Sequence, residues 1–415
     1  MTDEQSDEQF AHTRMRDVAH GNVTRQQPNE RLVHSETEDA ESVSLTNQPP
    51  SEQPVQTEHT AHEIDNTQPG TEQSAHEIDD DQGSVADSTF YETASDTTSL
   101  KSNIFKYRYE NGRRYHAYKD GAYWGPNDED AADHLDIAHH LFLLTLNNKL
   151  HLAPLPGHVE NVLDIGTGTG IWAMCDHLPF VRTSAQILIA YQNSDFADLH
   201  PEAEVIGTDL SPTQPGFVPP NLKFIIDDAT DEWTWPENHF DFVHVRSLFG
   251  CFSDWPAFYE QCFRHLKPGG WIEQVEMAPG FRSDDGTVER EAIGMWHDLG
   301  VKCGEANGKT FRVMYDMRRW IEEAGFKEVV ETVYKWPIGS WPKDKKWKEI
   351  GRWSRLHIET GLESWSLAVL TRVMGWSVQE AQILIAKVKA NLRDPSIHGW
   401  HEMRVVYATK PRRES

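Results

Sequence analysis

The chain has 415 residues and a formal net charge of −27, with 66 acidic residues against 39 basic ones. Such an acidic chain is not predicted to have the basic face that direct nucleic-acid binding requires. Apolar runs such as Leu141 to Leu144 are too short to span a bilayer. Four cysteines without C-x-x-C spacing or a signal peptide predict neither a disulfide framework nor a metal site. We therefore expect a cytoplasmic or nuclear protein without a membrane partner.

Composition separates the first quarter of the chain from the rest. Residues 1–100 contain 22 Asp or Glu, 4 Arg, no Lys and no Trp, so they carry −18 of the formal charge. A segment so poor in apolar residues cannot bury enough surface to offset the entropy of an ordered chain. We predict a disordered acidic tail over 1–100 and a folded domain over 101–415.

The folded part is expected to begin with an N-terminal cap over residues 101–157. Aromatic residues are dense from Phe105 to Trp124, and Asn127-Asp128-Glu129 can cap a helix whose apolar positions recur at a 3.6-residue period up to Leu144. The tyrosines of this segment fit ordinary packing. Their ring faces also suit a cationic ligand, so both interpretations stay open.

The stretch from Val162 to Gly170, V-L-D-I-G-T-G-T-G, predicts a buried strand, a tight turn and the start of a helix. Glycine lacks the Cβ that would hinder a ligand near the backbone, and a helix start offers unpaired N–H groups. The dinucleotide fingerprint is G-x-G-x-x-G, whereas this turn has glycine at 166, 168 and 170. That spacing is similar to the turn of S-adenosylmethionine (SAM) enzymes and disfavours a nicotinamide cofactor.

Two further strands end in acidic residues. Glu204 to Asp209 reads as a buried strand whose final carboxylate can accept hydrogen bonds from both hydroxyls of a ribose. Leu222 to Asp227 is a third strand, and Asp228 with the backbone N–H of Ala229 can read the edge of an adenine. Both acids also fit a simpler role as turn caps, which the sequence leaves open.

The remaining signals complete a sheet. Strands are predicted over Phe240 to Val245, leading to Arg246, and over Trp271 to Glu276, with a helix from Trp255 to Leu266 between them. Alternating strands and helices indicate a parallel sheet that binds ligands at the carboxyl ends of its strands. A helix is predicted near Val288 to Leu299, and additional strands follow at Glu328 to Tyr334 and Met403 to Ala408. Helical patterns at about 340–395 look like an insertion before the last strand.

Cys175 to Ser194 is an excess of 20 residues. An acid at the end of the second strand normally follows the glycine turn by about 20 residues, but Gly170 and Asp209 are 39 apart. Joining I-W-A to D-F-A-D-L-H-P would give one amphipathic helix. A translated intron explains the excess, because it would begin G-T at the third base of the Met174 codon and end A-G within the Ser194 codon, leaving an Ile codon. A real loop near the ligand site is the alternative.

In order along the chain, L-D-I-G-T-G-T-G-I-W, V-I-G-T-D-L-S-P, F-I-I-D-D-A-T-D-E-W and L-K-P-G-G-W-I-E resemble the fungal LaeA-like methyltransferases. The resemblance spans about 107–410 and includes Y-R-Y-E-N-G-R-R-Y-H-A-Y near its start. It implies an α/β, Rossmann-like class I methyltransferase fold with a seven-stranded, mostly parallel sheet and an antiparallel last strand. It also implies SAM as cofactor, a link to secondary metabolism and a velvet-type regulator as partner.

By that resemblance the three glycines hold the methionine portion of SAM, Asp209 holds the ribose, and Asp228 with Ala229 holds the adenine. The full set of expected cofactor-binding residues is Asp164, Gly166, Thr167, Gly168, Gly170, Asp209, Leu210, Asp228, Ala229 and Arg246. The thioether departs as a neutral molecule, so methyl transfer needs mainly alignment of the reacting atoms, and the sequence assigns no catalytic residue. The methyl acceptor is a small molecule or a protein. The runner-up hypothesis is a regulatory partner that keeps the fold with little turnover.

Overall fold

The computed structural model describes residues 104–174, 181–182, 188–189 and 196–412. The predicted acidic tail and most of Cys175 to Ser194 lie outside the described residues. The main sheet has seven strands in the order β10-β11-β9-β8-β3-β6-β7. In chain order these strands are β3 (Asn161–Ile165), β6 (Glu204–Asp209), β7 (Leu222–Ile226), β8 (Phe240–Arg246), β9 (Leu266–Ser283), β10 (Lys327–Pro337) and β11 (Gly399–Thr409).

The direction of the strands confirms the predicted fold class. Strands β7, β6, β3, β8 and β9 pair in parallel, and β11 pairs antiparallel with both β9 and β10. The chain passes from β3 to β6 on one side and later returns to β8 on the other side of β3. Because ligands of such sheets bind where the strand order reverses, the carboxyl end of β3 is the expected centre of the site.

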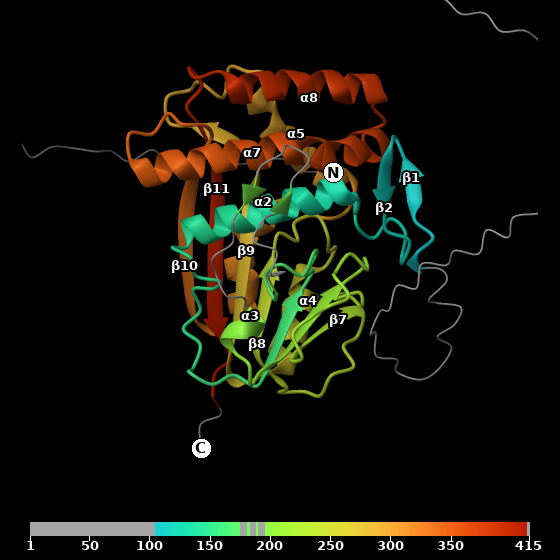
Figure 1. The fold of residues 1–415 in the computed structure, drawn as a ribbon, viewed down its shortest axis with the longest axis vertical. Coiled ribbons are helices and arrows are strands. Elements are labelled where there is room, and N and C mark those ends of the chain that lie inside the picture. Colours follow the sequence, from blue (N-terminus) through green and yellow to red (C-terminus); the bar gives the residue numbers. More distant parts are fainter. Residues whose placement is uncertain (1–103, 175–180, 183–187, 190–195, 413–415) are drawn as a thin grey trace, which may run out of the picture. The chain divides into compact units, whose positions relative to one another are not determined.

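Helices cover the sheet and one of its ends. Figure 1 shows α2, α7 and α8 side by side, with α7 between the other two and α2 crossing in front of the long strands β9 and β11. A small hairpin of β1 (Arg108–Glu110) and β2 (Arg113–Tyr115) precedes α2. The helical elements are α2 (Glu129–Thr145), α3 (Phe196–Leu199), α4 (Trp255–His265), η1 (Ala292–Gly294), α5 (Met295–Ala306), α6 (Val313–Glu323), α7 (Lys345–Ala368), η2 (Val369–Val373) and α8 (Val378–Arg393).

Two predicted helix starts are confirmed by their caps. Asp128 precedes α2 and accepts a hydrogen bond from the Ala131 N–H, and Asp254 does the same for Ala257 at the start of α4. A capped N-terminus satisfies backbone donors that have no partner within the helix. In the sequence, helices α7 and α8 come after β10 and before β11, which agrees with the predicted extra helices before the last strand.

Some element bounds differ from the predictions. Strand β9 runs from Leu266 to Ser283 rather than Trp271 to Glu276, because β11 pairs with it in two stretches from Trp271 to Ser283. The helix predicted near Val288 to Leu299 begins only at Met295, after the short η1 turn. Strand pairing and helix starts of this kind depend on neighbours that are remote in the sequence.

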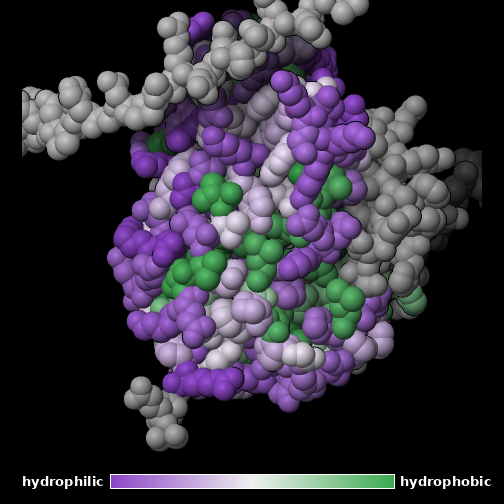
Figure 2. Space-filling model, turned by 90° about the vertical axis from the view of Figure 1, so that its left-hand side faces the viewer, coloured by the Kyte–Doolittle hydropathy of each residue, from purple (hydrophilic) through white to green (hydrophobic). Residues whose placement is uncertain are grey.

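Strand β10 forms one edge of the sheet. Its exposed apolar side chains include Val330 and Val333, which are 39% and 50% exposed. Figure 2 shows the side of the molecule on which β10 lies, with hydrophobic side chains in separate patches among hydrophilic ones. Charged residues such as Lys327 and Lys335 lie on the same strand, and charges of this kind oppose pairing with another chain. None of the described helices is long and apolar enough to cross a membrane.

Candidate cofactor site

The glycine turn after β3 has a backbone that only glycine adopts readily. Gly166, Gly168 and Gly170 have φ angles of +66°, +60° and +83°. A Cβ on Gly166 would lie 2.4 Å from Cδ2 of Leu248, and one on Gly170 would lie 2.4 Å from Cζ of Phe224. The turn is therefore shaped by both backbone conformation and close packing, and side chains at these positions would push it open.

Asp164 supports this turn from within the sheet. Its Oδ2 accepts a hydrogen bond of 2.6 Å from the Thr167 hydroxyl, and its Oδ1 lies 2.7 Å from Nδ1 of His244. The His244 ring stacks on Trp172 with a centroid distance of 3.9 Å, and burial lowers the pKa of His244. Asp164 itself is 3% exposed. In this structure it holds neighbouring side chains in place.

Asp209 connects the end of β6 to the glycine turn. Its Oδ2 accepts a 2.9 Å hydrogen bond from the Gly168 N–H, and its Oδ1 accepts one of the same length from Ser211. Burial raises the pKa of Asp209 to about 6, although these N–H donors favour the charged form. The turn-capping role that the sequence left open is therefore present. Each carboxylate oxygen can accept a second hydrogen bond, so a ribose role is compatible with it.

Asp228 lies just after β7 and is bound by two neighbours. Its Oδ1 accepts from the N–H and the hydroxyl of Thr230, at 2.9 and 2.7 Å. Its Oδ2 lies 2.9 Å from Nζ of Lys119, which comes from the segment before α2. Ala229 accepts a hydrogen bond from the indole of Trp233 through its carbonyl oxygen.

A cavity of about 230 Å³ lies where these elements meet. Asp164 and Gly170 are not among the residues that line it. The expected cofactor residues that do line it come from the ends of four parallel strands, and they are Gly166, Thr167, Gly168, Asp209, Leu210, Asp228, Ala229 and Arg246. The fold has thus brought together residues that are up to 80 positions apart, as a ligand that bridges the strand ends requires.

Arg246 links the end of β8 to helix α2. Its guanidinium lies 3.1 Å from Nδ1 of His139 and over the ring of Phe142, 4.9 Å from the ring centroid. Burial and the nearby Arg246 hold the pKa of His139 well below its usual value, so this ring is neutral and can accept from the guanidinium. Nearby, burial raises the pKa of Asp136 to about 7, and Asp136 accepts a hydrogen bond from Thr169.

Sequence reasoning missed one side of the cavity. Helix α2 contributes small and apolar side chains such as Ala132 and Leu135, and Lys309 reaches the cavity from the loop after α5. Of the aromatic residues between Phe105 and Trp124, only Tyr123 lines it. The apolar stripe of α2 was visible in the sequence, but a stripe does not reveal whether it packs on a core or on a ligand.

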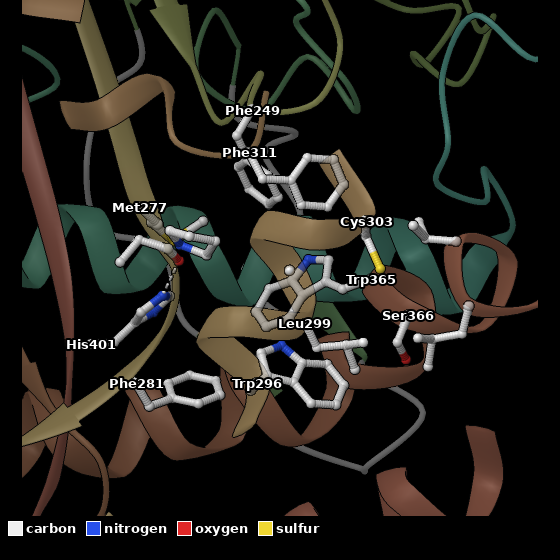
Figure 3. Close-up of a pocket in the computed structure, with 15 residues that line it drawn as sticks. Phe249, Met277, Phe281, Trp296, Leu299, Cys303, Phe311, Trp365, Ser366 and His401 are labelled. Atoms are coloured by element: carbon white, nitrogen blue, oxygen red, sulfur yellow. Dashed lines mark hydrogen bonds between the residues drawn. The ribbon is translucent and has the colours of Figure 1, made fainter. Parts of the chain in front are cut away.

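A second, mainly apolar cavity of about 40 Å³ lies near the first (Figure 3). The turn from Leu248 to Cys251 contributes to both, since Leu248 and Cys251 line the first cavity while Phe249 lines the second. Buried Glu276 holds this turn by accepting a 2.9 Å hydrogen bond from the Leu248 N–H. The rings of Phe281, Phe311, Trp296 and Trp365 surround the second cavity together with Phe249, and the ring of His401 projects toward it from β11.

The groups that line the first cavity suit an organic ligand. Within residues 104–174 and 196–412 no cluster of three or more His, Cys, Asp or Glu side chains could hold a metal ion. The first cavity combines the glycine turn, the strand-end carboxylates of Asp209, Asp227 and Asp228, the guanidinium of Arg246 and apolar side chains. This mixture suits a ligand with hydroxyl, amine and apolar parts.

Comparison with known proteins agrees with the fold. A methyltransferase-domain family model matches residues 137–332. The methyltransferase pytC of Aspergillus terreus is 38% identical over 328 residues, which are 78% of this chain and 94% of the relative. The secondary metabolism regulator LAE1 of Cochliobolus heterostrophus is 34% identical over 73% of this chain and 94% of its own length.

A third relative, the protein-methionine methyltransferase laeA of Emericella nidulans, is 32% identical over 321 residues. These cover 76% of this chain and 79% of the relative. The range of the methyltransferase-domain model, 137–332, spans the glycine turn and the strand-end acids that line the first cavity. The chain belongs to the LaeA-like family of fungal methyltransferases.

Proposed function

We propose that the first cavity binds S-adenosylmethionine and that the protein transfers its methyl group to an acceptor. The observation that carries this proposal is the convergence of the glycine turn, Asp209, Asp228 and Arg246 on one cavity. Their donor and acceptor types match the parts of SAM. The glycines of the turn let the methionine portion approach the backbone, while the carboxylates of Asp209 and Asp228 can each accept from hydroxyl or amine groups.

Each group has a distinct task in this proposal. The turn from Gly166 to Gly170 holds the methionine portion, Asp209 accepts from the ribose hydroxyls, and Asp228 accepts from the adenine amine. Asp164 and Gly170 would act indirectly, by supporting the turn behind the cavity wall. Bound SAM supplies an activated methyl group on a sulfonium. The residues of this chain supply position and alignment, which are worth several kcal/mol when reacting atoms are held in line.

No general base is assigned. Burial raises the pKa of the Cys251 thiol far above its usual value, so this cavity-lining group is a protonated thiol near neutral pH and a poor nucleophile. His139 is neutral but its Nδ1 is occupied by Arg246. An acceptor that must lose a proton would need another base.

The biological role is proposed from the relatives. Since they include regulators of secondary metabolism, we propose that this protein acts in the regulation or biosynthesis of secondary metabolites, in the cytoplasm or the nucleus. The acceptor is a small molecule or a protein side chain, and a velvet-type regulator is a candidate partner. A regulatory role without turnover is the competing function, and it would leave SAM binding intact.

Two measurements test the proposal. Isothermal titration should show one SAM site per chain and no site for NAD. Incubation of the full chain with radiolabelled SAM in an extract of the source organism should move label into protein or into organic-soluble material. A protein that does not bind SAM would refute the proposed cofactor, and binding without transfer to either fraction would favour the regulatory role.

A further inference from the structure

Residues 116–124, here called the strap, connect the β1–β2 hairpin to α2 and extend along the cofactor cavity. Ala122 and Tyr123 line the cavity. The strap is tied to three separate elements by hydrogen bonds. Lys119 reaches Asp228 and Asp231 after β7, Lys309 donates to the Ala122 carbonyl oxygen, and the Trp124 indole donates to the Phe249 carbonyl oxygen at 3.2 Å.

The contact between Lys119 and Asp228 involves the residue that is proposed to bind adenine. The Thr230 N–H and hydroxyl both bind Oδ1 of Asp228, which uses the accepting capacity of that oxygen. Oδ2 accepts from Lys119 at 2.9 Å and keeps one further position for a donor. An adenine amine that binds Asp228 would therefore share Oδ2 with the ammonium group of Lys119.

Burial and charge make this contact more than a surface ion pair. The Asp228 side chain is 11% exposed and that of Lys119 is 34% exposed, so the pair is partly shielded from water. Burial opposes the charge on Lys119, but its hydrogen bonds to Asp231 and Asp228 outweigh burial and raise its pKa. For Asp228, burial favours the neutral form, while the hydrogen bonds from Thr230 and Lys119 lower the pKa overall.

We propose that Lys119 is a positioning residue for base recognition: it directs Oδ2 of Asp228 toward the cavity and keeps this carboxylate an acceptor for the 6-amino group of adenine. The proposal rests on the proposed function, because it requires a SAM-type ligand in the first cavity. Its consequence is selectivity. A ligand with oxygen at position 6 of the purine would place an acceptor against a charged carboxylate and should bind worse.

The test compares S-adenosylhomocysteine with S-inosylhomocysteine, in which oxygen replaces the 6-amino group and N1 becomes a hydrogen-bond donor. Dissociation constants are measured by titration calorimetry for the wild type, Lys119→Met and Lys119→Arg. The wild type should prefer the adenosyl ligand at least tenfold. Lys119→Met keeps the length of the side chain without its donors and should reduce this preference at least fivefold, whereas Lys119→Arg should retain most of it.

Lys335→Met is the matched control, because Lys335 also pairs with an acid, Asp284 at 2.8 Å, but on the exposed surface of β10. It should leave the preference unchanged. An equal loss of affinity for both ligands in Lys119→Met would overturn the positioning role, since a purely structural strap would affect them alike. If Lys119→Met does not fold, a Lys119→Arg protein that prefers the adenosyl ligand less than twofold would also overturn the positioning role.

Wild-type protein that binds neither ligand would refute the proposed cofactor and the role of Lys119 together. Wild-type protein that binds S-adenosylhomocysteine, combined with an unchanged preference in both Lys119 variants, would refute only the role of Lys119. The two failures are therefore distinguishable.

Discussion

Asp209 shows how one side chain can serve both the fold and a ligand. Its carboxylate joins the glycine turn to the end of β6 through Gly168 and caps the following turn through Ser211. These two contacts orient both oxygens, so a ribose would meet a carboxylate that is already in place. Fixing a side chain before binding reduces the entropy that binding must offset.

Replacing Asp209 by Ala should weaken SAM binding by about 1.5–3 kcal/mol, the range for hydrogen bonds to a charged group. Titration calorimetry measures the change, and thermal unfolding verifies that the variant is folded. Asp209→Asn is the control for shape, because it retains an acceptor but loses the charge. It should lose less affinity than Asp209→Ala. Unchanged affinity in a folded Asp209→Ala protein would contradict the ribose assignment.

Arg113 of β2 connects the N-terminus of α2 to the inserted helix α7. Arg113 donates to both oxygens of Asp128, at 2.6 and 2.7 Å, and also to the Ser364 hydroxyl. Asp128 is in addition the N-cap of α2. The cap helix that lines the cofactor cavity is therefore positioned by a contact to the insertion before the last strand.

Replacing Arg113 by Met should lower the free energy of unfolding by about 3–5 kcal/mol, because it leaves a partly buried carboxylate without its partner. Urea unfolding followed by circular dichroism gives the value. Arg352→Met is the control, since Arg352 pairs with Glu349 on the exposed face of α7 at 3.3 Å. Its effect should stay within about 0.5 kcal/mol. Similar decreases in the free energy of unfolding for the two variants would show that the Arg113–Asp128 pair stabilises the fold no more than an exposed ion pair.

The helix after the glycine turn bears on the excess segment. The Ala197 N–H donates to the Ala173 carbonyl oxygen at 3.1 Å, and Trp172 stacks on Phe196 with a centroid distance of 4.7 Å. If one residue replaced Met174 to Ser194, Ala173 and Ala197 would be four positions apart, so this bond would be an ordinary α-helical one. Within the segment, only the strand pair β4 (Val181–Arg182) and β5 (Leu188–Ile189) is described.

We expect that replacing Met174 to Ser194 by a single Ile raises the free energy of unfolding and improves SAM affinity. Closing a loop of about 20 residues costs about 2–3 kcal/mol of entropy, and the shortened chain avoids this cost. Both forms would be compared by urea unfolding and SAM titration, and transcript sequencing would show whether the segment is spliced out. A shortened protein that binds SAM worse than the full chain would show that the segment contributes to SAM binding.

At the scale of the whole molecule, buried ionisable groups make stability depend on pH in two opposite ways. Burial raises the pKa of Glu273 and Glu276 to about 7, and it lowers the pKa of His134 to about 3 and of His401 to about 4. In the unfolded chain a glutamate titrates near its ordinary pKa of about 4.3, so the raised carboxyl groups contribute stability that is lost as pH rises from about 4.3 through about 7. The neutral histidines contribute stability that is lost as pH falls below their ordinary pKa of about 6.5.

Between about pH 4.3 and 6.5 the two contributions therefore oppose each other, and above about pH 7 both level off, because the folded and unfolded chains then hold the same number of protons on these groups. Glu273→Gln should make the change in the free energy of unfolding from pH 5 to pH 7 more positive than in the wild type, because a neutral amide does not ionise in this range, resembles the protonated carboxyl and can still accept from the Leu152 and Ala153 N–H groups. Urea unfolding at several pH values measures this. Glu349→Gln on the exposed face of α7 is the control. A Glu273→Gln protein whose free energy of unfolding changes between pH 5 and pH 7 as in the wild type would exclude Glu273 as a source of this pH dependence.

The amino-acid sequence by itself determined the sheet and most of the candidate site. Glycine spacing and strand-end acids are local signals, since a strand with a following turn places its own last residues at the carboxyl edge of the sheet. For that reason the strands that carry Gly166, Asp209 and Asp228 agree with their predicted positions to within a residue or two.

Only the tertiary structure decided which other groups reach the cavity. Lys119 meets Asp231 across 112 positions of the sequence, and Lys309 reaches Ala122 across 187. The tertiary structure also shows that Asp164 and Gly170 do not line the cavity and support the turn from behind. Such contacts arise when separate elements pack, and no periodicity or turn signal encodes them. The strap and the second cavity belong to this class for the same reason.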